Sequence, residues 1–368
     1  LRHCDVSLRE KGSVFFCSRP SGGRYKNKES QGWVTAIGRD GRAQLEIVCT
    51  EASQDVHALP NGNIIYTEPR SGRITEIDRN GNCQAMWHAR GQWREKEPPS
   101  GSIELPISVL HHTVSLMPNG HFLLMSAEAR TYTDWYTSTS DVEAPRARVN
   151  VVGDVVLEVS RDGVVKNEWR LLDLLDPYRV GHGSLSDNWH KKGFPNSCDW
   201  GHANAAKYDP FDDSILVSLR HQDCIVKFAR STGQLHWILG NHSHWSPSFT
   251  QYLLSPTNGL QWPFHQHDCS VTGPNRVMCF DNGNFRASAF QLKQDDREIR
   301  SRAVEYEINT DDMSVKEIWS YGDAPAEKIY ACFQGGAQRL ARPGNTLMRG
   351  NVMSISHWNN ISMNKARS

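Results

Sequence analysis

The stretch VTAIGRDGRAQLEIV at residues 34–48 consists of a short apolar segment, a polar turn and a second β-favouring segment. Asp and Gly in the turn are the residue types that tight turns between antiparallel strands favour. The same pattern recurs in ITEIDRNGNCQAMW (74–87), VLEVSRDGVVKNEW (156–169), IVKFARSTGQLHW (225–237) and VEYEINTDDMSVKEIW (304–319), each ending on Trp. We expect these Trp residues to pack in the interior. A repeated antiparallel unit that cannot bury its own face predicts a β-propeller.

A second repeated pattern supplies two further strands to each unit. Its segments begin at Gln54, His112, His202, His267 and about Ala337. Turn-forming residues divide each segment in two, for example PNG at 60–62 and at 118–120. The sequence therefore predicts an all-β protein built from four-stranded antiparallel blades, and the pattern leaves five or six blades open.

Three polar stretches interrupt the repeat, at about 90–108, 130–150 and 171–200. We expect them to form loops over one face of the propeller, with one or two helical turns in the third. No segment has the composition of an interdomain linker, so residues 1–368 are predicted to form a single domain. Strands from both termini are expected to close the ring, because closure removes exposed sheet edges. After Asn351 the sequence does not continue the strand pattern.

Composition excludes several function classes. Lys plus Arg and Asp plus Glu both number 41, and no basic block is present, which argues against a nucleic-acid partner. No apolar run approaches the 18 or so residues of a membrane span. The nine cysteines form no CxxC pair and no zinc-ribbon spacing. The chain starts at Leu1 without a leader, as expected of a cytoplasmic protein or of one whose signal has been removed.

Three histidines, His112, His202 and His267, occupy the same position in the repeat, at the start of an inner strand. Because the starts of inner strands lie near the axis of a propeller, these imidazoles are predicted to converge. Arg220 ends the strand that pairs back toward His202, so a guanidinium is expected beside them. Such a group suits a phosphate or sulfate. A neutral imidazole is also a good nucleophile, and a second histidine can transfer a proton near neutral pH.

Two other interpretations stay open. In the first, His112, His202 and His267 bind a divalent metal such as Zn²⁺ or Cu²⁺ in a lyase or oxidase, although Arg220 would repel a cation. In the second, the propeller is a non-catalytic binding platform. The aromatic residues of the three interruptions either stack on a ligand ring or anchor their own loops; these are Trp93, Trp135, Tyr136 and Trp189.

Four stretches carry a resemblance to a known family: 199–245, which begins DWGHANAAKYDPFDD, 252–268, 280–288 (FDNGNFRAS) and 301–322. With them the chain resembles the bacterial aryl-sulfate sulfotransferases over about residues 50–350. The resemblance implies a six-bladed propeller. It also implies a ping-pong transfer of a sulfuryl group from an aryl sulfate donor to a phenolic acceptor, without 3′-phosphoadenosine-5′-phosphosulfate or any other cofactor. The family members are exported, which favours a periplasmic or secreted protein; the oligomeric state is left open.

The resemblance also assigns roles to residues. His267 is expected to be the nucleophile that forms a sulfohistidine. His202 and Arg220 are expected to contact the sulfuryl oxygens and assist the leaving group, and His112 to complete the catalytic set. Residues expected to bind substrate around them are Asn204, Gln266, Asn282, His111 and His265; no metal ligands are expected unless the three-histidine alternative holds.

Overall fold

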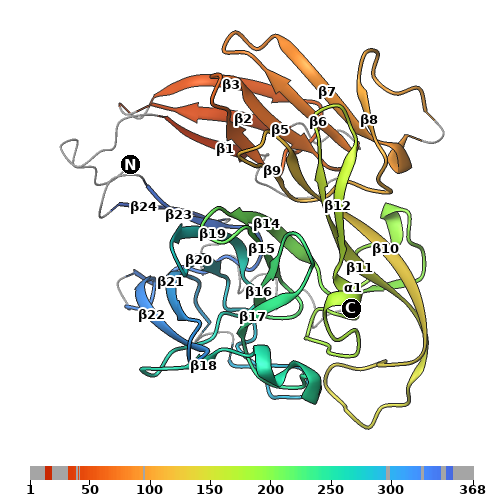
Figure 1. Ribbon diagram of the computed structural model, residues 1–368, viewed down its shortest axis with the longest axis vertical. Coiled ribbons are helices and arrows are strands. Elements are labelled where there is room, and N and C mark those ends of the chain that lie inside the picture. Colours follow the sequence, from red (N-terminus) through yellow and green to blue (C-terminus); the bar gives the residue numbers. More distant parts are fainter. Residues whose placement is uncertain are drawn as a thin grey trace, which may run out of the picture. The chain divides into compact units, whose positions relative to one another are not determined.

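The computed structural model describes residues 13–18, 32–38, 40, 42–93, 96–295, 299–324, 327–340 and 345–350 (Figure 1). The chain divides into two compact units, which we describe separately. The first consists of Leu1–Glu128 and Asp154–Arg170, and the second of Ala129–Gly153 and Leu171–Ser368. Residues 351–368, where the sequence leaves the strand pattern, lie outside the described residues.

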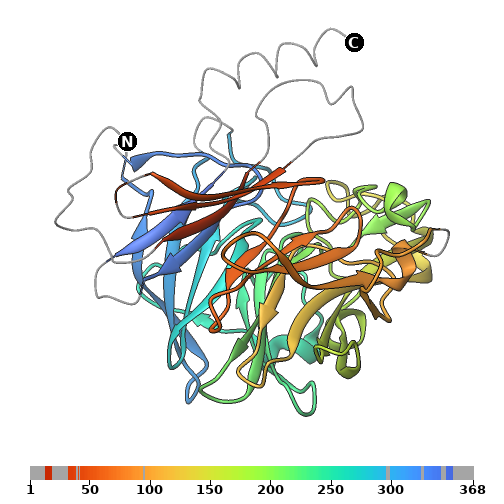
Figure 2. The ribbon, with the colours of Figure 1, turned by 90° about the horizontal axis from the view of Figure 1, so that it is seen from above.

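The first unit contains two complete sheets and one end of a third. The first sheet, drawn in red in Figure 2, comprises β1 (Val14–Ser18), β2 (Gly32–Ile37) and β3 (Ala43–Cys49). The second comprises β4 (Val56–Ala58), β5 (Ile64–Glu68), β6 (Arg73–Ile77), β7 (Cys83–Ala89) and β8 (Ile103–Leu105), with the short 3-10 helix η2 (Arg90–Gln92) between the last two. The third has the order β12 (Val165–Arg170), β11 (Ala147–Val159), β10 (Phe122–Trp135) and β9 (Val114–Leu116); β10 and β11 continue into the second unit.

The second unit contains two further large sheets and a hairpin. One sheet comprises β14 (Ala203–Asp209), β15 (Ser214–Leu219), β16 (Cys224–Ala229) and β17 (Leu235–Gly240). The other comprises β19 (His267–Gly273), β20 (Arg276–Asp281), β21 (Arg302–Asn309), β22 (Ser314–Tyr321) and the edge strand β18 (Ser255–Pro256). The remaining elements are α1 (Leu171–Leu174), η3 (His190–Lys192), β13 (Ser197–Asp199), η4 (Pro247–Tyr252), β23 (Gly336–Arg339) and β24 (Thr346–Arg349).

All ten hairpin strand pairs predicted from the repeats are present. The five outer hairpins are β2–β3, β6–β7, β11–β12, β16–β17 and β21–β22; the five inner pairs are β4–β5, β9–β10, β14–β15, β19–β20 and β23–β24. Each pair is antiparallel, so local turn chemistry and alternation are sufficient to specify it. The prediction of an all-β protein of the propeller class is confirmed.

The expected number of blades is wrong. The described strands form five sheets of three to five strands, and β23 and β24 form a separate two-stranded sheet. The protein therefore has five blades among its described residues, not six. The physical reason is that a blade needs an outer hairpin, and the sequence holds five of these. The closure of the ring by strands from both termini stays a prediction.

Apolar faces of neighbouring sheets form the cores. In the first unit, Trp87 and Phe122 meet edge to face with ring centroids 4.9 Å apart, an arrangement that aromatic pairs favour. Trp87, Trp169 and Trp237 are buried as predicted. Trp319 is only partly buried, and the Arg339 guanidinium lies over its ring.

The stretch 130–150, expected to be a loop, is strand at both ends, and only residues 136–146 between the strands are irregular. β10 continues to Trp135, and β11 begins at Ala147. Side chains along this part of β10 alternate between partly buried and exposed, and Thr131, Tyr132 and Thr133 are residue types that strands favour. The other two interruptions contribute the short strands β8 and β13, which pair in parallel with β7 and β11. Among the described residues, no helix has the length and apolar character needed to cross a bilayer.

Candidate functional site

His267 is the first residue of β19, in the second unit, and its ring is held from one side by Asn282. The Nδ1 atom of His267 lies 2.7 Å from Asn282 Oδ1. The amide nitrogen of Asn282 donates to the carbonyl oxygens of Ala331 and Gln334, at 2.6 and 2.8 Å. Because both donations fix the orientation of the amide, Oδ1 must face His267 and accept the Nδ1 proton. The neutral ring therefore carries its lone pair on Nε2.

The same histidine is kept uncharged. Burial and the positive charge of Arg220 lower the pKa of His267 to about 3. At neutral pH its Nε2 atom has a lone pair, which accepts the backbone N–H of Gln334 at 3.2 Å in this structure. An imidazole that is neutral and fixed as one tautomer is suited to act as a nucleophile.

Arg220 follows β15 and returns to the start of β14, as the hairpin pattern predicts. Its backbone N–H donates to the carbonyl oxygen of His202 at 3.2 Å. Its Nη1 atom donates to Nε2 of His221 at 2.9 Å, and Nη2 donates to the Cys332 carbonyl at 3.4 Å. Arg220 thus adds a fixed positive charge to a region of imidazoles, which is what a sulfate or phosphate group requires.

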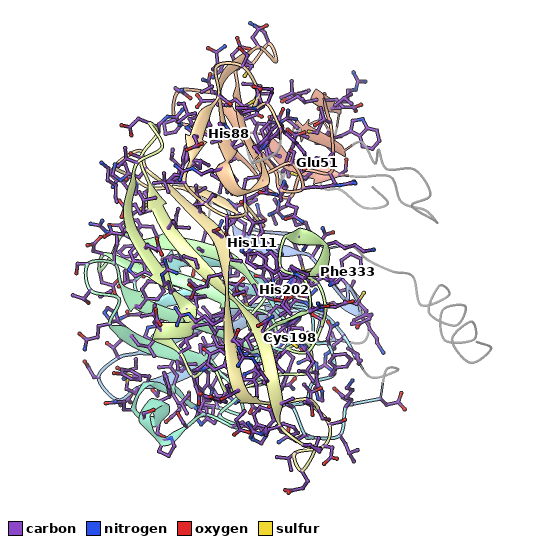
Figure 3. The ribbon with its side chains drawn as sticks, turned by 90° about the vertical axis from the view of Figure 1, so that its right-hand side faces the viewer. Glu51, His88, His111, Cys198, His202 and Phe333 are labelled. Carbon is purple, nitrogen blue, oxygen red and sulfur yellow. The ribbon has the colours of Figure 1, made fainter. Side chains whose placement is uncertain are left out.

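His202 has a buried carboxylate partner that sequence reasoning missed. Its Nδ1 atom lies 2.5 Å from Asp199 Oδ2, while Oδ1 of Asp199 accepts the indole N–H of Trp189 at 2.8 Å. Asp199 is fully buried at the end of β13. Figure 3 labels Cys198, the residue before it, and His202. The carboxylate orients the imidazole and can stabilise its protonated form, so His202 is equipped to accept and return a proton. The sequence signal is an aspartate three residues before His202, inside an expected loop.

His221 is the second residue that sequence reasoning missed. Its ring stacks on that of His202 with centroids 4.6 Å apart. Burial, the largest cause, and the charge of Arg220 lower its pKa well below the usual value. Its Nδ1 atom lies 2.8 Å from the Asp199 carbonyl oxygen and therefore donates to it, since Nε2 accepts from Arg220.

Among the described residues, Asp199, His202 and His221 form a group that could hold a metal, because one ligand atom from each lies within 4.8 Å of the others. The fit is poor. Both ring nitrogens of His221 are engaged in hydrogen bonds, and the Arg220 guanidinium stands beside the group. A hydrogen-bonded network describes these contacts better than a ligand set. The three-histidine metal set expected as an alternative stays a prediction, because His112 belongs to the first unit and His202 and His267 belong to the second.

Three further residues that were expected to bind substrate also make hydrogen bonds within the protein, as Asn282 does. Asn204 bridges two blades by donating to the carbonyl of Gln266 and accepting the N–H of Asp268. The Gln266 side chain is fully buried and donates toward Ser218, Leu219 and Cys224. His265 is also buried, and its backbone N–H donates to Asp223 Oδ1 at 2.7 Å.

His111 and His112 interact with each other in the first unit. Their Nδ1 atoms lie 2.8 Å apart, and Nε2 of His111 lies 2.9 Å from the Ser126 carbonyl oxygen. Since Nε2 must then carry the His111 proton, its Nδ1 accepts from His112. The backbone N–H of His112 donates to Gln54, the residue that shares its phase in the preceding blade. Gln54 therefore supports the backbone at this position.

Two curated relatives of this chain are arylsulfate sulfotransferases. The arylsulfate sulfotransferase AssT of Escherichia coli O6:H1 (strain CFT073) is 28% identical over 226 residues, covering 50% of this chain and 37% of that protein. AssT of Lelliottia amnigena is 27% identical over 228 residues, with the same coverage. The chain thus matches well under half the length of these curated relatives.

Among the solved structures that are similar, a Bacteroides caccae protein of unknown function has a TM-score of 0.43 and 13% identity, covering 84% of this chain and 82% of that one. The family model described as Arylsulfotransferase (ASST) matches residues 14–366, nearly the whole length. The chain belongs to the arylsulfotransferase family.

Proposed function

We propose that this protein transfers a sulfuryl group from an aryl sulfate to a phenolic acceptor, through a sulfohistidine at His267. The observation that carries the proposal is a buried, neutral imidazole in the field of Arg220. Its Nδ1–H donates to Asn282 Oδ1, which leaves Nε2 as the nucleophilic atom. Family membership and the two AssT relatives support the same chemistry.

In the first half-reaction, Nε2 of His267 attacks sulfur, the nitrogen–sulfur bond forms and the sulfur–aryl oxygen bond breaks. The lone pair of Nε2 is released for attack when the Gln334 N–H gives way to substrate. The leaving phenolate takes a proton from His202, which Asp199 supports. Arg220 offsets the negative charge on the sulfuryl oxygens, and Asn282 Oδ1 stabilises the positive charge that the ring acquires.

In the second half-reaction, the acceptor phenol gives its proton to His202 and its oxygen attacks sulfur. The nitrogen–sulfur bond breaks, and His267 returns to its neutral form. No cofactor takes part in either step. The proposal leaves the natural donor and acceptor open within the classes of aryl sulfates and phenols.

The experiment is release of 4-nitrophenol from 4-nitrophenyl sulfate by metal-stripped protein, with and without phenol. We expect release that depends on phenol and is lost in His267→Ala, with a sulfated protein when the acceptor is omitted. His236→Ala, which alters a partly buried histidine on β17, is the matched control and should keep full activity.

Two results would contradict the proposal. Activity that appears only after a divalent metal is restored would favour the Asp199, His202 and His221 group as ligands. Absence of turnover across a panel of aryl sulfates and phenols, with intact folding, would favour a binding platform.

A further inference from the structure

Next to the histidine network of the second unit, several buried polar atoms have no hydrogen-bond partner among the described residues. They are Nδ1 and Nε2 of His182, Nε2 of His265, Oδ1 of Asn284 and Oγ of Ser288. His265 is 1% exposed, so its ring is removed from bulk water. Buried polar groups are nearly always paired in native proteins, and a group of unpaired ones indicates a bound molecule or water.

The ring of Phe285 connects these residues. It meets the His182 ring edge to face at 5.4 Å and the His265 ring at 5.2 Å. The ammonium of Lys293 lies 4.0 Å from the centre of the same ring. Phe285 has a φ of 63°, a conformation that costs a bulky residue energy and that persists only where the surroundings impose it.

The charges around Phe285 favour an anion. Lys293 contributes to the lowered pKa of both His182 and His265, after burial, and Arg220 contributes to that of His265. The facing acid is Asp223, whose Oδ1 lies 2.9 Å from His265 Nδ1. Burial raises the pKa of Asp223 to about 7, so its negative charge is weakened. The neighbouring cation Arg179 is engaged with carbonyl oxygens around Gln222.

This group is continuous with the catalytic histidines. His265 precedes His267 by two residues, and its ring lies 6.0 Å from that of His221. An aromatic ring, two imidazoles with unpaired nitrogens and an ammonium together match a ligand that has an aromatic ring and a negatively charged oxygen.

We propose that His182, Phe285 and Lys293 form the subsite that binds the aromatic ring of the aryl sulfate beside His267. The ring contacts Phe285, while Lys293 and a His182 N–H bind oxygen atoms of the ligand. This inference rests on the proposed function, because it identifies the part of that site that selects an aryl over an alkyl sulfate.

The test measures binding in the His267→Ala background, where transfer cannot occur. Calorimetry with 4-nitrophenyl sulfate and with methyl sulfate is compared before and after adding Phe285→Ala. We expect binding of the aryl ester to weaken by about tenfold, the scale of a lost aromatic contact, and binding of methyl sulfate to stay unchanged. Phe249→Ala, at a partly buried phenylalanine of η4 in the same unit, is the control and should change neither.

Further variants keep the test valid if Phe285→Ala destabilises the fold. Phe285→Leu preserves bulk, and Lys293→Met removes the charge from an exposed position. Each should weaken aryl sulfate binding with an unchanged thermal melting curve. In protein that retains His267, the same substitutions should raise KM for 4-nitrophenyl sulfate more than they lower kcat.

The two proposals fail in different ways. Transfer by the wild-type protein together with unchanged binding in all Phe285 and Lys293 variants would overturn the subsite and leave the function standing. Binding that depends on Phe285 without any transfer would uphold the subsite and overturn the function. Equal losses for Phe285→Ala and Phe249→Ala would overturn the subsite, as would Phe285→Ala weakening the binding of aryl and methyl sulfate equally.

Discussion

Asp199 lies outside the repeated segments, and its carboxylate orients the imidazole of His202, which lies inside one. Its carboxylate is fully buried, receives a hydrogen bond from Trp189 and lies 2.5 Å from Nδ1 of His202. A carboxylate in this position keeps the proton on Nδ1, so that Nε2 of His202 can exchange protons with a substrate oxygen. In the proposed mechanism Asp199 is therefore a positioning residue that acts through His202.

We predict that Asp199→Asn lowers kcat for phenyl sulfate about 100-fold or more, the usual scale of lost proton transfer. The loss should be much smaller for 4-nitrophenyl sulfate, because 4-nitrophenolate leaves with little need of a proton. Steady-state rates with both esters between pH 5 and 9 measure this difference. Trp189→Phe, which removes one hydrogen bond from Asp199, should have a weaker effect in the same direction. Equal losses with both esters would instead indicate structural damage.

At the scale of elements, the turn between β14 and β15 is held by a lysine from the next strand. Nζ of Lys227 on β16 lies 2.7 Å from Asp209 Oδ2 and 2.7 Å from Asp212 Oδ2. The side chains of Lys227 and Asp209 are both only 3% exposed. This ion pair fixes the far end of the hairpin whose near end carries His202 and Arg220.

We predict that Lys227→Met lowers the free energy of unfolding by about 3 kcal/mol or more, because it leaves the Asp209 carboxylate buried without its cation. Lys316→Met is the matched control: Lys316 pairs with Glu307 at 2.5 Å on the outer strands of the next blade, but both side chains are considerably exposed. Its loss should cost less than about 1 kcal/mol. Urea unfolding of both variants makes the comparison. Similar losses of unfolding free energy in the two variants would show that burial of the ion pair does not determine its contribution to stability.

At the scale of the whole molecule, buried neutral imidazoles link folding to pH. Burial lowers the pKa of His221, His265 and His267 below the value near 6.5 that they have in the unfolded chain. Below pH 6.5 the unfolded chain binds protons that these folded histidines do not. The contribution of these histidines to the free energy of unfolding is therefore fully present above pH 6.5 and is lost as the pH falls. Asp223 opposes them: with its pKa raised to about 7, it favours folding more as the pH falls.

His267→Gln isolates one of these histidines. Between pH 8 and pH 5 we predict that the wild-type protein loses about 2 kcal/mol more unfolding free energy than the variant, given a folded pKa of about 3. Urea unfolding at several pH values measures both curves. Asp223 and the other groups act equally in the two proteins and cancel in the difference. Parallel curves would mean that the pKa of His267 is the same in the folded and the unfolded protein.

The hairpins and the phase of His202, His267 and Arg220 were accessible from the sequence, because turn type and alternation act over a few residues. Antiparallel register alone returns Arg220 to the level of His202. The strand extension of β10 was also encoded locally, in its Thr and Tyr residues, but their polarity suggested a loop.

The sequence specifies the all-β class, the strand pairs, the family resemblance and the first candidate residues. The five blades of the described residues became apparent from the three-dimensional fold, as did the grouping of Asp199 and His221 with His202 and the contact by which Asn282 fixes the tautomer of His267. The fold also brought Phe285 to His182 and Lys293. Those neighbours come from turns and interruptions far apart in the chain, where no period governs which side chains meet. Their contacts depend on how whole blades pack, which is a balance of burial and hydrogen bonding that no local pattern records.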